Sequence, residues 1–173
     1  KKSDLANYVS HRKVVLDLLS MAINMQKNGN YSKEDLIHNL ILPMGKDSTE
    51  LFQDESNLWI IDERLSFHNY LGSDKTLNSM PITESKSTKE PDILVLNVFD
   101  NPLLVSEGLS LPLASISVVE IKRPMRNDIA EGEEKNPIEQ ALGYLDRARK
   151  GKIKTANGRL IPECENIPGF CYI

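Results

Sequence analysis

The sequence predicts an α/β or α+β domain in which helices flank a small mixed β-sheet. Two observations indicate this class. Apolar residues recur at helical spacing in the first 70 residues and again near residue 140, whereas residues 92–100 and 115–124 are rich in β-branched residues and predict strands. At 173 residues, with 40% hydrophobic and 27% charged residues, the chain is long enough to bury a core.

Two helices are predicted at the start of the chain. The first covers residues 4–28, with Ser3 or Asp4 as its N-cap. After an Asn-Gly-Asn break, a second helix begins at Ser32 and ends before Pro43. The apolar positions of the first helix follow helical spacing: Leu5, Val9, Val15, Leu18, Leu19, Ala22 and Ile23.

The middle of the chain predicts a third helix, a loop and two strands. The helix is expected over residues 57–71, and residues 72–91 predict a mobile loop because they are rich in Ser, Thr, Lys and Asn. The strands 92–100 and 115–124 follow, joined by a segment that is long for a hairpin. The third helix would present an apolar face made of Leu58, Ile61, Leu65 and Tyr70.

The last helix has the clearest boundary signals. Asn136 is expected as N-cap, Pro137 lies in the first turn and Gly151 ends the helix. A basic segment and a final strand complete the sequence. We expect residues 1–50 to form an N-terminal helical segment packed on a core of residues 51–173, and the chain to be a fragment of a larger multidomain protein, because both ends look cut.

Composition excludes some classes of protein. No apolar run approaches the ~20 residues that cross a bilayer, and no signal peptide is present, so we expect a cytoplasmic protein without membrane contact. The two cysteines are too few for a disulfide framework. A net charge of −4 argues against a protein that coats nucleic acid, although an enzyme with a local basic strip stays possible.

Charged residues inside the second strand indicate chemistry. Because side chains alternate along a strand, Glu120 and Lys122 share a face. If the two strands pair in antiparallel fashion, Asp92 lies beside both residues. Two adjacent carboxylates repel unless one takes up a proton or a cation binds, and oxygen ligands suit Mg²⁺ or Mn²⁺. The lysine could then stabilise charge on a phosphate under attack. A solvated, charged edge strand is the alternative interpretation.

These residues resemble the PD-(D/E)XK nuclease superfamily. "PDILV" and "VVEIKRP" match its core, and Gln140 and Tyr144 in "EQALGY" match the Q-x-x-x-Y motif of the RecB-like and lambda-exonuclease-like branch. The resemblance covers residues 57–150. It implies a restriction-endonuclease-like core with N-terminal helices, and helix residues that position the substrate. It also implies Mg²⁺ or Mn²⁺ held by Asp92, Glu120 and the backbone carbonyl of Ile121.

The family usually carries one more acid on a helix before the core strands. Glu63 in "IIDERLSFH" is the best match and would be a further metal ligand. Asp62 and His68 compete with it for this role.

A basic run follows the Gln-Tyr helix. Residues 146–159 hold six positive side chains and one acid. Such a strip suits phosphate contact, although cations at the end of a helix are favoured by its dipole in any case. The predicted nucleic-acid-binding residues are Arg147, Arg149, Lys150, Lys152 and Lys154.

The sequence therefore predicts a Mg²⁺-dependent nuclease domain that hydrolyses phosphodiester bonds of DNA, with RNA as a possible substrate. The resemblance also suggests a setting, because such domains occur within large bacterial proteins, some of them defence proteins. The alternative is an inactive nuclease-like module that acts in nucleic-acid binding or protein assembly. Expected partners are DNA and further domains of the same polypeptide, and a homo-oligomer with a second copy of the chain stays open.

Overall fold

The protein is seen in a computed structural model that carries side chains. The structure describes the following residues: 2–24, 29, 33–52, 55–99, 114–123 and 136–173.

Three α-helices and a four-stranded sheet make up the described part of the chain. The helices are α1 (Lys2–Ile23), α2 (Glu34–Ile41) and α3 (Pro137–Lys150). The strands are β1 (Tyr70–Ser73), β2 (Ile93–Val98), β3 (Ala114–Val119) and β4 (Gly169–Tyr172). Short 3₁₀ helices lie between them: η2 (Leu58–Ile60), η3 (Glu63–Ser66), η4 (Leu77–Ser79) and η6 (Cys164–Asn166).

The sheet is mixed, as the sequence predicts. Its strand order is β1-β2-β3-β4, and the first three strands are antiparallel neighbours. β4 pairs with β3 in parallel. In the β2–β3 pair Ile93 lies opposite Val119, which fixes the register at the end of the sheet where the predicted acidic residues lie.

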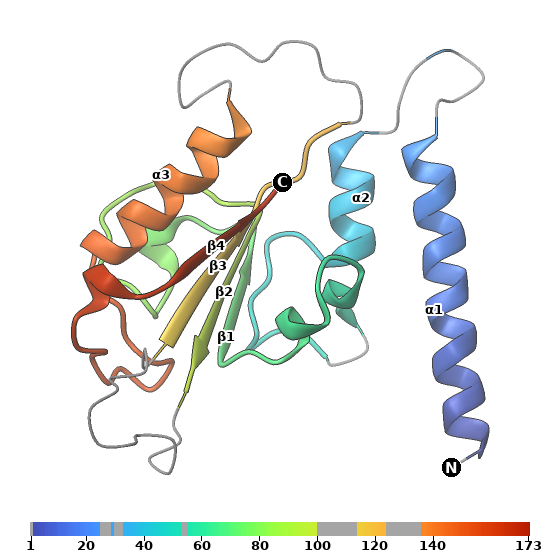
Figure 1. The fold of residues 1–173 in the computed structure, drawn as a ribbon, viewed down its shortest axis with the longest axis horizontal. Helices are drawn as coiled ribbons and strands as arrows, with labels where there is room; N and C mark the ends of the chain where they lie inside the picture. The colour runs from blue at the N-terminus through green and yellow to red at the C-terminus, as the bar shows by residue number, and fades with distance from the viewer. Residues whose placement is uncertain (1, 25–28, 30–32, 53–54, 100–113, 124–135) are drawn as a thin grey trace.

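Helices cover both faces of the sheet (Figure 1). α3 lies on one face, whereas α2, η2 and η3 lie on the other. Each face has its own apolar cluster. Leu94 and Val118 point towards α3, and their neighbours Ile93 and Val119 point towards α2. The central strands are thus buried on both sides, which explains the nearly continuous apolar run in β2.

The prediction of a helix over residues 57–71 is wrong. The segment contains η2 and η3 and then the first residues of β1. The Asp62 side chain accepts a hydrogen bond from the Arg64 backbone N–H at the start of η3. Tyr70 lies opposite Leu96 and is completely buried. Pairing with β2 therefore decides the conformation at the end of this segment.

The prediction of a mobile loop over residues 72–91 is also wrong in its central part. Leu77, Met80 and Ile82 are at most 2% exposed and belong to the apolar cluster beneath α3. Because the residues between them are polar, the composition of the segment did not reveal these three buried side chains, which hold it on the sheet.

The helix boundaries agree with the sequence to different degrees. α1 begins at Lys2, so Ser3 and Asp4 lie within the helix and are not its caps. The predicted cap Ser32 lies outside the described residues, as do residues 25–28. At α3 the prediction is confirmed, because the Asn136 side chain accepts a hydrogen bond from the backbone N–H of Ile138 and Pro137 is the first helical residue.

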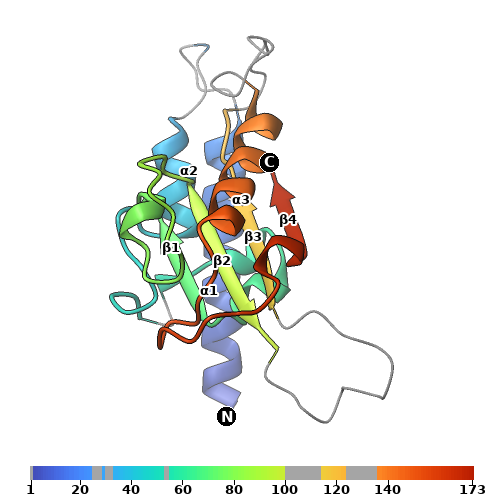
Figure 2. The ribbon, with the colours of Figure 1, turned by 90° about the vertical axis from the view of Figure 1, so that its left-hand side faces the viewer.

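α1 lies beside α2 but buries little of its own surface (Figures 1 and 2). Only Val15 and Ala22 of this helix are buried. Several predicted core positions are exposed instead, because α1 is apolar around much of its circumference: Leu5, Val9, Leu18 and Ile23.

Candidate active site

The register of β2 and β3 brings two of the predicted acids together. Asp92 and Glu120 each lie one residue beyond the last pair, Ile93 and Val119, at the same end of the sheet. The Asp92 Oδ2 atom accepts a hydrogen bond of 2.6 Å from the backbone N–H of Ile121. The antiparallel pairing that the sequence predicts is therefore confirmed, and Asp92 connects directly to the segment that carries Glu120.

Lys122 is part of the same group. Its Nζ atom lies 2.5 Å from Glu120 Oε1. The Lys122 side chain is 17% exposed and that of Glu120 is 3% exposed. Such an ion pair is stabilised by its short distance but loses hydration on both sides. The second carboxylate oxygen, Glu120 Oε2, is buried without a hydrogen-bond partner among the described residues.

The environment opposes the charged forms of both acids. Burial raises the pKa of Asp92, and this effect is only partly offset by the Ile121 N–H and the charge of Lys122. Burial also raises the pKa of Glu120, and the negative charge of Asp92 raises it further, against the ion pair with Lys122. The end of the sheet therefore holds more negative charge than its lysine balances, a condition that a bound cation would relieve.

A third carboxylate, Glu34, approaches from the first turn of α2. Its Oε1 atom accepts a 3.0 Å hydrogen bond from the Arg123 backbone N–H, one residue after Lys122. Its charge contributes to the raised pKa values of Asp92 and Glu120. Sequence reasoning missed this residue.

Glu63, which the sequence suggests for this role, lies elsewhere. Its carboxylate accepts two hydrogen bonds from the Arg12 guanidinium, at 2.6 and 3.1 Å, and its side chain is 63% exposed. The competitor Asp62 binds Arg64 and Tyr172 instead. His68 bonds through Nδ1 to the Leu65 carbonyl. The acid that the structure brings to the Asp92–Glu120 pair is Glu34.

His38 lies one helical turn after Glu34 and is also buried near the acids. Its Nε2 atom lies 2.9 Å from the Ser73 hydroxyl oxygen. Burial lowers the pKa of His38, whereas the Asp92 carboxylate and a hydrogen bond with the Asp92 backbone oppose that shift. Their i,i+4 spacing puts Glu34 and His38 on one face of α2, but the sequence alone does not show that this face meets the acids.

The Gln-Tyr helix supplies packing at one of its two motif positions. Tyr144 is 6% exposed and belongs to the apolar cluster under α3, together with Leu94 and Val118. Gln140 is half-buried one turn earlier on the same helix. Their role towards a substrate stays a prediction.

Several residues of the basic run are engaged within the chain. The Arg149 guanidinium donates to the Ile167 carbonyl, and Lys154 pairs with Glu84. Lys150 lies 2.7 Å from Asp146 in an i,i+4 pair, while Lys152 is exposed and Arg147 is half-buried. These interactions compete with the predicted phosphate contacts of Arg149, Lys150 and Lys154.

The donor set fits a hard divalent cation in its chemistry. Within the described residues, no three side chains of His, Cys, Asp or Glu are grouped closely enough to hold a metal ion by themselves. Asp92 and Glu120 provide two carboxylates, and Mg²⁺ commonly binds through one or two carboxylates and keeps several waters. The unpaired buried Oε2 atom of Glu120 and the raised pKa values of both acids agree with such a site.

Comparisons with known proteins identify no relative of this chain. No family model, curated protein or solved structure matches the chain. Among the described residues, no helix combines the length and the apolar character needed to cross a membrane.

Proposed function

We propose that this chain is a metal-dependent nuclease domain of the PD-(D/E)XK type that hydrolyses phosphodiester bonds of DNA. The observation that carries the proposal is the convergence of Asp92, Glu120 and Lys122 at one end of the sheet, with an excess of buried negative charge. Carboxylates and a lysine in this arrangement are the groups that metal-dependent hydrolysis of a phosphodiester bond requires.

The residues divide the work as follows. Asp92 and Glu120 would hold Mg²⁺ or Mn²⁺, together with the Ile121 carbonyl, which is next to the N–H that orients Asp92. When bound, such an ion polarises a phosphate and increases the acidity of water. Lys122 would orient the attacking water and stabilise negative charge on the phosphate. Glu34 would hold the Arg123 backbone, and thus the segment after Lys122, in position.

A cleavage assay with matched variants tests the proposal. Glu120→Gln and Lys122→Met preserve side-chain size, and each should reduce Mg²⁺-dependent DNA cleavage by about 100-fold or more, the loss typical of one essential electrostatic group. Glu55→Gln removes an ion pair with Lys46, which has no proposed role in cleavage, and should leave the rate unchanged. If Glu120→Gln and Lys122→Met both cleaved DNA at the wild-type rate, these residues would be excluded as the active site. DNA and RNA substrates assayed in parallel decide the substrate class.

A nuclease-like module without activity is the second candidate. The observation in its favour is that each of the three acids already has a donor partner: Ile121 for Asp92, Lys122 for Glu120 and Arg123 for Glu34. Calorimetric titration with Mn²⁺ separates the two functions. A nuclease should bind the ion in a manner that depends on Asp92 and Glu120, whereas a scaffold that binds no ion would support the second candidate.

A further inference from the structure

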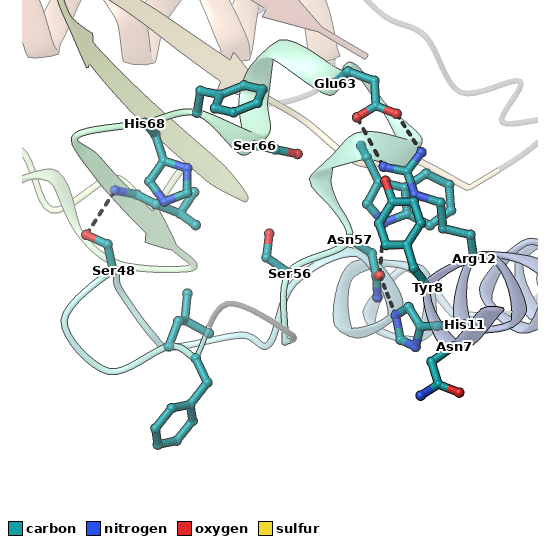
Figure 3. Close-up of a pocket in the computed structure, with 15 residues that line it drawn as sticks. Asn7, Tyr8, His11, Arg12, Ser48, Ser56, Asn57, Glu63, Ser66 and His68 are labelled. Carbon is teal, nitrogen blue, oxygen red and sulfur yellow. Dashed lines mark hydrogen bonds and ion pairs between the residues drawn. The ribbon is translucent and has the colours of Figure 1, made fainter. Parts of the chain in front are cut away.

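A cavity of about 690 Å³ lies between α1 and the segment from Ser48 to Leu71 (Figure 3). Its size falls within the range of small-molecule sites in proteins. The residues that line it do not include the acids of the candidate active site. Figure 3 shows His68 on one side of the cavity and Arg12 with Asn57 on the other, with the hydroxyl groups of Ser56 and Ser66 between them.

One wall of the cavity is a stack of planar groups. The Arg12 guanidinium lies 4.5 Å from the centre of the Tyr8 ring and 4.3 Å from that of the Trp59 ring. Its charge is balanced by Glu63, which accepts hydrogen bonds of 2.6 and 3.1 Å from it. Arg12 is the only Arg or Lys among the described residues that line the cavity, so these residues offer no uncommitted cation to a phosphate or carboxylate.

The polar groups of the cavity have fixed roles. Asn57 Oδ1 accepts a hydrogen bond from Trp59 Nε1 at 3.1 Å and lies 3.2 Å from His11 Nε2. Because the amide oxygen can only accept, His11 Nε2 is the donor in this contact. The His68 Nδ1 atom lies 3.1 Å from the Leu65 carbonyl oxygen, which can also only accept, so Nδ1 is the donor there. Both histidines line the cavity, and each has a second ring nitrogen outside these two contacts.

Two aromatic side chains at the cavity are largely exposed. Phe52 is 74% exposed and Phe67 is 78% exposed. Neither ring contributes much to the core, so the hydrophobic effect within this chain does not account for their positions. Exposed rings next to a polar cavity are suited to stacking against a flat aromatic ligand whose faces are apolar and whose edges carry polar groups.

We infer that this cavity binds a nucleobase. Three properties select that class of ligand. The balanced charge of Arg12 and Glu63 favours an uncharged group, and the exposed rings of Phe52 and Phe67 favour a planar one. The hydroxyls of Ser56 and Ser66 and the histidines that line the cavity favour an edge with several hydrogen-bonding groups. The base could belong to a free nucleoside or to a single strand. The inference does not depend on the proposed nuclease function.

Trp59 makes the inference directly measurable, because it is the only tryptophan in the chain and it lines the cavity. Tryptophan fluorescence of the whole chain would be titrated with each common nucleoside, with a single-stranded oligonucleotide and with ribose 5-phosphate, in the presence of EDTA. We expect saturable quenching by nucleosides, by the oligonucleotide or by both, and none by ribose 5-phosphate. Binding of the oligonucleotide alone would identify the strand as the source of the base.

Variants at the exposed rings provide the control. Phe52→Ala and Phe67→Ala should each weaken binding by about tenfold, the typical loss of one stacking ring. Phe99→Ala removes a ring of 52% exposure that does not line this cavity and should change nothing. The inference would be overturned if no base-containing probe gave saturable quenching, if both cavity variants kept the affinity of the wild type, or if ribose 5-phosphate quenched as strongly as the nucleosides. EDTA prevents cleavage, so a failed nuclease proposal would not affect this result.

Discussion

Asp92 and Glu120 occupy largely buried positions at which two carboxylates destabilise the fold unless a cation binds them. Both acids are largely removed from water, and the charge of Asp92 raises the cost of ionising Glu120. Lys122 balances one negative charge, whereas Glu34 adds another nearby. Core positions of this kind usually hold apolar residues, so the local instability is consistent with a site kept for binding a cation.

The raised pKa values of these acids predict a specific pH dependence of stability. The folded protein binds protons at Asp92 and Glu120 more tightly than the unfolded chain does. Stability from these groups is therefore greatest at low pH and is lost as the pH rises through their raised pKa values. His38 acts in the opposite direction, because its lowered pKa makes acidification destabilising. Comparison of wild type with Glu120→Gln at each pH isolates the contribution of the Glu120 carboxyl group to stability.

Thermal unfolding between pH 5 and pH 8 measures the effect. Without divalent cations, the Tm of wild type relative to Glu120→Gln should fall as the pH rises. Added Mn²⁺ should raise the wild-type Tm more at pH 8 than at pH 5, because the cation binds the ionised acids. The Glu120→Gln protein should show little of this increase. An equal effect of Mn²⁺ on both proteins would show that the cation binds elsewhere.

At the scale of elements, α2 is the helix that joins the site to the sheet. It packs on the face opposite α3 and carries Glu34 and His38 one turn apart. Glu34 reaches the Arg123 backbone, and His38 reaches Ser73 at the end of β1. The helix thus fixes two segments that flank the acids, which is the usual role of residues that orient metal ligands.

Substitution of Glu34 tests this role of α2. Glu34→Gln keeps an acceptor for the Arg123 N–H but removes the charge, and it should lower Mn²⁺ affinity by about tenfold. Asp35→Asn makes the same change at the next residue, which is exposed, and should have little effect. Isothermal titration with Mn²⁺ measures both. Equal losses in the two variants would mean that α2 acts only through its general negative charge.

How much the sequence predicts depends on whether the signals are local. The boundaries of α3 were predictable because Asn136, Pro137 and Gly151 act within the helix itself. β1 was not, because Tyr70 is held in a strand by Leu96, which is distant in sequence. Asp92 and Glu120 could be placed together from alternation and antiparallel pairing alone. The approach of Glu34 depends on how α2 packs against the sheet, which no local pattern specifies.

For the whole molecule, the sheet and its two apolar clusters form the stable body, and α1 is attached to it more weakly. Ala22 is the only residue of α1 in either buried cluster, with Leu19 packed against it. Polar and aromatic contacts also join α1 to the body, such as Arg12 with Trp59 and Glu63 and His11 with Asn57. Elements with few buried apolar contacts open at lower free energy than the core.

Arg12→Ala should therefore loosen α1 without disturbing the sheet. The substitution removes the stacking on Trp59, for which about 0.5–1 kcal/mol is typical of a partly exposed cation–π contact, together with the pair with Glu63. Hydrogen exchange followed by mass spectrometry should show faster exchange over α1 and unchanged exchange over β2 and β3. Lys13→Ala, at an exposed neighbouring position, is the matched control. If the strands exchanged faster to the same extent as α1, the helix and sheet would unfold as one cooperative unit, and the cavity beside α1 would be as rigid as the core.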